Sequence, residues 1–235
     1  MIKIEHTYVV GWEPAIRGMR NPKNSWHLSD SGWYINWNRC DDTGYQFKIG
    51  PNDHKLMMQL RGGGTDDRKF MRMIAVYLDI TAPLYWWKEF DTYKVGTVAN
   101  SCSTMHKIHE RDLKLEDFSC EKLIDTVDDL DICIQDASDG GYTTPRDILD
   151  FTVEGLNIYR AKFIETKDKK YWHQMIQLLP TSYNQRRTIM LNYEVLANMH
   201  KSRKTHKLDE WREFCKWIES LPYSELITGE VKSDA

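Results

Sequence analysis

The sequence lacks a long apolar run, an excess of charge of one sign and a clustered set of cysteines. No stretch approaches the roughly 18 apolar residues of a membrane-spanning helix, so we expect no membrane partner. The 32 Lys and Arg residues nearly balance the 35 Asp and Glu residues, which argues against a nucleic-acid partner bound through its phosphates. Five widely spaced cysteines, and an N-terminus without the apolar stretch of a signal peptide, predict reduced thiols in the cytoplasm.

Several motifs that would indicate a particular chemistry are also missing. Two acids, Asp66 and Asp67, follow the glycines 62–64 and would repel a phosphate, so these glycines indicate the end of a helix. Cys102 lies four and seven residues before His106 and His109, a spacing that suits a zinc site on a helix. No fourth ligand is apparent, and we predict no metal site. No base is placed to activate Cys102 either, which favours a packed thiol over a nucleophile.

The sequence is instead rich in aromatic side chains, with 9 Trp and 12 Tyr. Such rings supply large buried areas and flat surfaces on which ring ligands can stack. Composition alone favours an aromatic core or subunit interface over a stacking site. No repeat, low-complexity tract or linker interrupts the chain, which predicts a single domain over residues 1–235.

In the first half of the chain, alternating apolar residues predict strands, and capping and proline signals predict helices. The expected elements are a strand over 2–10, a hairpin of 33–37 and 45–49, a helix capped by Asn52, a buried strand over Phe70–Ile80 and a helix starting at Pro83.

The second half shows helical spacing of apolar residues. Thr144, Pro145 and Asp147 form a hydroxyl cap, a first-turn proline and the acid of a capping box. Strands early and helices late predict an α+β fold, with a small sheet covered by helices. The expected helices cover 121–137, 144–163, 170–179, 183–202 and 207–220.

Three separated segments carry a further signal. Residues 80–108 run through a strand and Ala-Pro into a helix, and residues 15–20 read Ala-Ile-Arg-Gly-Met-Arg. In order and spacing these segments resemble the flavin-dependent thymidylate synthases. The resemblance covers most of the chain and implies that family's fold, with a helical C-terminal half. The third segment is Leu179-Pro180 followed by Arg186, Asn192, Asn198 and Arg203.

The chain departs from the family's signature, which is Arg-His-Arg, seven residues and then serine. Thr92, Tyr93 and Lys94 stand at the Arg-His-Arg positions. The seven-residue gap is kept, and Cys102 stands at the serine. Lys94 keeps a cation, but a hydroxyl cannot replace the bidentate phosphate recognition of a guanidinium. The family's flavin-contacting histidine falls on Met73.

The resemblance implies two sets of site residues. Arg203 is the implied catalytic residue, because it would stabilise charge that develops on the base. Without the resemblance, its neighbours Lys201 and Lys204 indicate a solvated basic face. Glu194 replaces a family arginine that faces the flavin, and His206 lies within one residue of a family histidine. The implied substrate-binding residues are Lys88, Glu89, Ser101, Cys102, Ser103, Thr104, Arg186 and Arg203, and the implied cofactor-binding residues are Thr92, Tyr93, Lys94, Asn192, Glu194, Asn198 and His206.

The resemblance implies a homotetrameric enzyme that uses FAD and shares its active sites between subunits. It would move a one-carbon unit from methylenetetrahydrofolate to C5 of a pyrimidine deoxynucleotide, with NADPH restoring the reduced flavin. The altered signature leaves a second interpretation open: a relative that binds a nucleotide or flavin as a regulatory or binding protein, or that modifies a different nucleotide. Glu89 favours it, because its charge would repel a phosphate and suit a sugar hydroxyl or an amino-bearing base.

Overall fold

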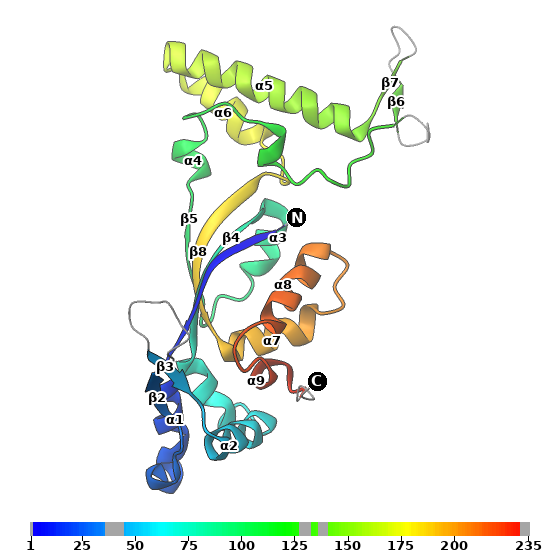
Figure 1. Cartoon of the computed structure of the whole chain (residues 1–235). Coiled ribbons are helices and arrows are strands. Elements are labelled where there is room, and N and C mark those ends of the chain that lie inside the picture. The colour runs from blue at the N-terminus through cyan, green and yellow to red at the C-terminus, as the bar shows by residue number, and fades with distance from the viewer. Residues whose placement is uncertain (1, 36–44, 127–132, 136–140, 231–235) are drawn as a thin grey trace. The chain divides into compact units, whose positions relative to one another are not determined.

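The structure is a computed structural model that describes residues 2–35, 45–126, 133–135 and 141–230 (Figure 1). Helices and small sheets are mixed along the chain, which confirms the predicted α+β fold. Among the described helices, none combines the length and the apolar character needed to cross a membrane. The largest sheet has four strands in the order β1 (Lys3–Val10), β4 (Ala75–Pro83), β8 (Asn184–Asn192) and β5 (Val98–Ser101).

Two antiparallel hairpins stand apart from this sheet. In the first, β2 (Gly32–Ile35) pairs with β3 (Tyr45–Lys48), so that Trp33 faces Phe47. In the second, β6 (Ile134–Gln135) pairs with β7 (Tyr142–Thr143). The predicted hairpin at 33–37 and 45–49 is confirmed where it is described, and residues 36 and 37 lie outside the described part.

The chain divides into two compact units. The predicted single domain over residues 1–235 stays a prediction. One unit comprises Met1–Lys3, Ile80–Asp91 and Asn100–Arg187, and the other comprises Ile4–Asp79, Thr92–Ala99 and Thr188–Ala235.

The first unit is built around a helix pair. The long α5 (Pro145–Thr166) packs on α6 (Lys169–Leu178). Thr144 accepts a hydrogen bond from the Asp147 amide and donates to the Asp147 carboxylate, which confirms the predicted capping box. The remaining helices here are α3 (Leu84–Phe90), α4 (Thr104–Lys107) and η4 (Leu115–Asp117), and the buried apolar cluster is Ile108, Leu113, Phe118, Leu149, Val153, Leu156 and Met175.

The second unit buries most of the large aromatic side chains of its helices. Its central helix α7 (Tyr193–Arg203) packs on η3 (Asp67–Met73), α8 (Asp209–Glu219) and α9 (Glu225–Thr228). Tyr193, Trp211 and Phe214 are fully buried there. The other helices of this unit are α1 (Trp12–Arg20), η1 (Asn21–Lys23), η2 (Trp26–Leu28) and α2 (Pro51–Gly62).

Two of the predicted helices are wrong in whole or in part. The helix over 121–137 does not form in its described residues, where Leu123 and Ile124 remain exposed and bury no apolar face. The helix over 183–202 begins only at Tyr193. Before it, β8 buries Ile189 and Leu191 at every second position, and hydrogen bonding within the sheet favours the strand there.

Two boundaries in the first half also differ from the prediction. The N-cap of α2 is Gly50 with a proline directly after it, and the amide of Asn52 donates instead to the side chain of Asp30 at 2.9 Å. The strand expected over Phe70–Ile80 starts at Ala75, because the residues up to Met73 form a 3₁₀ helix.

Candidate functional site

Arg203, the last residue of α7, is held by an aromatic cluster in the second unit. Its Nε donates a hydrogen bond to the hydroxyl of Tyr93 at 3.0 Å. Its guanidinium carbon lies 4.7 Å from the centroid of the Trp211 ring and 5.6 Å from that of Tyr93. The two rings meet edge to face, with their centroids 6.1 Å apart. These contacts hold a half-buried cation in one place.

The neighbours of this cluster include three more predicted residues. The ring of His206 meets Trp211 edge to face at 6.3 Å, and its Nδ1 accepts a hydrogen bond from the Leu208 amide. Nε2 therefore carries the proton in the neutral imidazole. Thr92 and Lys94, on either side of Tyr93 in the sequence, have exposed side chains.

Trp211 belongs to the aromatic cluster around Arg203, but the sequence did not predict it as a site residue. It lies on the buried face of α8 together with Phe214 and Ile218, so its spacing indicated a core residue. Its contacts with Arg203, Tyr93 and His206 distinguish it from ordinary core aromatics.

Glu194, in the first turn of α7, forms an ion pair with Arg72 of η3. Arg72 Nε donates to Glu194 Oε2, and Arg72 Nη2 lies 3.3 Å from Oε1. The hydrogen bond that Arg72 donates to Glu194 raises the pKa of the Arg72 guanidinium. The side chain of Glu194 is 11% exposed and that of Arg72 is 53% exposed, so the cation is the accessible partner. The sequence offered one signal for Arg72, its place directly before Met73.

The segment after Lys94 packs against the start of α7 through Gly96 and Asn192. Asn192 is the N-cap of α7, and its Oδ1 accepts a hydrogen bond from the Val195 amide at 3.0 Å. Gly96 has φ of +81°, and a Cβ there would lie 3.0 Å from Asn192 Nδ2. Any larger residue at 96 would be strained and crowded. Asn198 lies further along α7, where it is exposed.

In the first unit, the segment 101–104 lies beside Arg186. The amide of Cys102 donates to the carbonyl oxygen of Arg186 at 2.9 Å, and Gln185 Nε2 donates to the Cys102 carbonyl at 2.8 Å. The side chains of Ser101, Cys102 and Arg186 are exposed. The structure therefore brings together these predicted substrate-binding residues.

The hydroxyl residues of this segment have different local roles. Ser103 Oγ accepts a hydrogen bond from the His106 amide at 3.0 Å and caps α4, of which Thr104 is the first residue. Lys88 and Glu89 lie in the last turn of α3, where Lys88 is exposed and Glu89 is half-buried.

Arg187 is a further arginine of this unit that the sequence interpretation missed. Its Nη1 lies 2.7 Å from Asp91 Oδ1, its Nε donates to Gln185 Oε1 at 2.9 Å, and its guanidinium lies over the Trp87 ring at 4.2 Å. A strand places Arg186 and Arg187 on opposite faces, whereas the predicted helix did not separate them in this way.

The predicted site residues thus form two groups, one in each compact unit. The exposed donors of the second unit are of the kind that an anionic cofactor needs, namely Arg72, Lys94 and Asn198. Within the described part of the chain, no three His, Cys, Asp or Glu side chains are placed to hold a metal ion.

Solved structures with the same fold identify the architecture. The chain is similar to thymidylate synthase X from Helicobacter pylori with FAD and dUMP, at 15% identity and a TM-score of 0.64, over 99% of this chain and 100% of that one. It is also similar to the UMP/dUMP methylase PolB from Streptomyces cacaoi bound with 5-Br UMP, at 13% identity and a TM-score of 0.53, over 97% and 94%. No family model and no curated protein matches the sequence. The chain has the fold of the flavin-dependent thymidylate synthases, as its sequence resemblance predicted.

Proposed function

We propose that this chain is a cytoplasmic, homotetrameric enzyme that transfers a one-carbon unit to C5 of a pyrimidine deoxynucleotide with the help of FAD. Methylenetetrahydrofolate would be the donor and NADPH the reductant. The observation that carries the proposal is the full-length likeness to a thymidylate synthase solved with FAD and dUMP and to a UMP/dUMP methylase.

Arg203 is the residue to which we assign the pyrimidine. Tyr93 and Trp211 fix the position of its guanidinium, a group that can pair with an anionic ligand. A guanidinium fixed before the ligand arrives can orient the base and stabilise negative charge as it develops on a carbonyl oxygen. In the first unit, Arg186 and the hydroxyls of Ser101 and Ser103 are the donors that we propose for a nucleotide phosphate.

A flavin fits the donors of the second unit in kind. The resemblance implies a guanidinium at position 194, where this chain has a carboxylate. The carboxylate of Glu194 pairs with Arg72, so a guanidinium still lies beside this position. Arg72, Lys94 and Asn198 would hold the cofactor, because all three are exposed donors. The flavin, when bound, supplies the hydride that completes the methyl group.

A second function is favoured by the same ion pair. The charge of Glu194 is already balanced by Arg72. Thr92 and Lys94 stand where the family signature has its two arginines. A protein with these replacements can keep nucleotide binding and lose the transfer. The second candidate is therefore a relative that binds a nucleotide or a flavin without the thymidylate reaction, or that modifies a different nucleotide.

Calorimetric titration with dUMP, followed by tritium release from dUMP labelled at C5, separates these functions. We expect dUMP to bind, FAD to be retained, and tritium release to require FAD, methylenetetrahydrofolate and NADPH together. Binding without tritium release would support the second candidate, and an absence of dUMP binding at every FAD concentration would contradict the first.

Arg203→Ala and Lys201→Ala form the matched pair for this experiment, since both residues lie in the last turn of α7. We expect Arg203→Ala to weaken dUMP binding at least tenfold and Lys201→Ala to change it less than twofold. Arg203→Lys keeps the charge but not the hydrogen-bonding fork, and an intermediate loss would show that the guanidinium itself is recognised. Equal effects of the two alanine variants would remove Arg203 from the site.

A further inference from the structure

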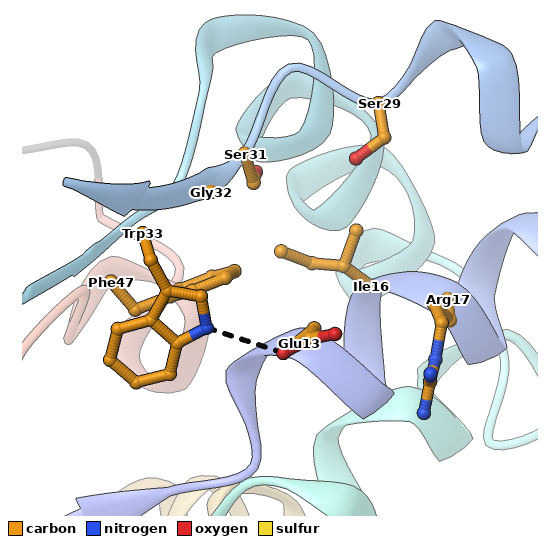
Figure 2. A pocket seen from close by; sticks show the side chains of 8 residues that line it. All are labelled: Glu13, Ile16, Arg17, Ser29, Ser31, Gly32, Trp33 and Phe47. Atoms are coloured by element: carbon orange, nitrogen blue, oxygen red, sulfur yellow. Dashed lines mark hydrogen bonds between the residues drawn. The ribbon is translucent and has the colours of Figure 1, made fainter.

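A pocket of about 250 Å³ opens in the second unit (Figure 2). Helix α1 contributes Glu13, Ile16 and Arg17 to its wall, and the β2–β3 hairpin contributes Trp33 and Phe47. Ser29 and Ser31, between η2 and β2, and Gly32, the first residue of β2, complete the lining. None of these residues belongs to the predicted nucleotide or flavin site.

A buried carboxylate fixes the polar wall of this pocket. Asp53 Oδ2 accepts hydrogen bonds from the hydroxyls of Ser29 at 2.7 Å and Ser31 at 2.6 Å, and from the backbone amides of Asp30 and Ser31. Its other oxygen pairs with Arg20 at 2.6 Å, and both of these side chains are buried. The segment 29–31 is therefore held in place before any ligand arrives, which reduces the entropy cost of binding.

Two aromatic rings form the apolar wall. The Trp33 and Phe47 rings meet edge to face, with centroids 5.4 Å apart and planes at 73°. Trp33 Nε1 donates to Glu13 Oε2 at 3.3 Å, which orients the indole beside Glu13 (Figure 2). Trp33 nevertheless stays 61% exposed, so a large flat face is free to stack on a planar ring.

Two opposite charges lie on the α1 side of the pocket. Glu13 and Arg17 are four residues apart on α1 and both are exposed. Within the described residues Glu13 keeps one carboxylate oxygen without a donor, and Arg17 makes no ion pair. The pocket therefore offers a hydrogen-bond acceptor and an unpaired guanidinium beside an aromatic face.

We propose that this pocket binds a planar heterocycle that has adjacent ring N–H and amino donors on one edge and an anionic tail. The ring would stack on Trp33, its donor edge would bond to the Glu13 carboxylate, and the tail would meet Arg17. Guanine presents this edge. Uracil does not, because the carbonyl oxygens beside its N–H would face a carboxylate.

The size of the pocket suits this class of ligand. The volume accommodates a two-ring heterocycle, but a ribose phosphate would have to remain at the mouth. A guanine nucleotide is therefore the ligand class that fits this pocket.

The test titrates GMP into the full chain by calorimetry, with dUMP at saturation so that a pyrimidine site is filled. We expect GMP to bind, and IMP, which lacks the amino group, to bind at least tenfold more weakly. A dissociation constant above about 1 mM for GMP would overturn the proposal.

Variants assign the binding to this pocket. We expect Glu13→Gln and Trp33→Ala each to weaken GMP binding at least tenfold. Arg17→Ala should weaken GMP binding at least fivefold and leave guanosine binding unchanged. Glu213→Gln, at an exposed ion pair of α8, is the control and should change nothing. Thermal unfolding checks that each variant folds, and dUMP binding that stays constant separates this pocket from the proposed function. Losses below twofold in Glu13→Gln and Arg17→Ala would place the ligand elsewhere.

Discussion

At the scale of single residues, a mutation that breaks the buried ion pair of Arg20 and Asp53 should cost much stability. Asp53 satisfies two hydroxyls, two amides and one guanidinium at once. Asp53→Asn would leave Arg20 buried without its counter-charge, and breaking such a pair costs about 3–5 kcal/mol. Chemical denaturation of the two proteins measures this loss. Asp112→Asn removes a pair with Arg160 in which Asp112 is 69% exposed, and it should cost less than about 1 kcal/mol.

The contribution of Asp53 also depends on pH. Burial raises its pKa, but the hydrogen bonds from Ser31 and Ser29 and the charge of Arg20 outweigh burial, so the pKa lies below its usual value. A carboxyl with a lowered folded-state pKa stabilises the fold above its unfolded pKa of about 3.9 and loses that contribution as pH falls through the folded value. The stability difference between wild type and Asp53→Asn should therefore be constant near neutral pH and shrink only below about pH 4. A difference that already shrinks between about pH 7 and pH 5 would contradict a lowered pKa.

At the scale of elements, the cap of α5 is the clearest local signal that the sequence and structure share. Thr144 is buried and exchanges hydrogen bonds with Asp147. We expect Thr144→Ala to lower the free energy of unfolding by about 1 kcal/mol. Thr152→Ala on the same helix is the matched control, because the Thr152 hydroxyl only donates back to the Ile148 carbonyl and should contribute nothing measurable. Equal losses from both variants would mean that the cap does not matter.

Elements with a local signal were predictable from the sequence, and those that depend on distant partners were not. The hairpin and α5 follow from alternation and from a capping box, which act within a few residues. By contrast, β8 exists because it lies between β4 and β5, and its Gln-Arg-Arg-Thr start has no strong strand pattern of its own. The apolar spacing over 121–137 fails for the converse reason, since no packed surface covers Leu123 and Ile124.

The candidate site shows the same division. The resemblance assigned Arg203 to the substrate and Tyr93 and His206 to the cofactor, and the structure places all three around Trp211. Arg72 could not be inferred in this way, because its partner Glu194 is 122 positions away and only folding makes them neighbours. Pairings across such distances require the tertiary structure.

At the scale of the whole molecule, the division into two units raises the question of whether they unfold separately. All four strands of the large sheet contribute residues to both units. For example, β4 begins in the second unit and ends in the first, whereas β8 begins in the first unit and ends in the second. Unfolding one unit would therefore remove part of every strand. We expect the chain to unfold as one cooperative domain, as its sequence predicts.

Differential scanning calorimetry of the two variants above tests this expectation. A single transition should appear, with an unfolding enthalpy on the order of 160 kcal/mol for a chain of this length and a van't Hoff enthalpy equal to it. Asp53→Asn lies in the second unit and Thr144→Ala in the first. Each should lower the whole transition, the former by roughly 10 °C and the latter by about 2–4 °C. Two resolved transitions, of which each variant moves only one, would instead establish two independent domains, because a local loss of stability spreads only as far as the cooperative unit extends.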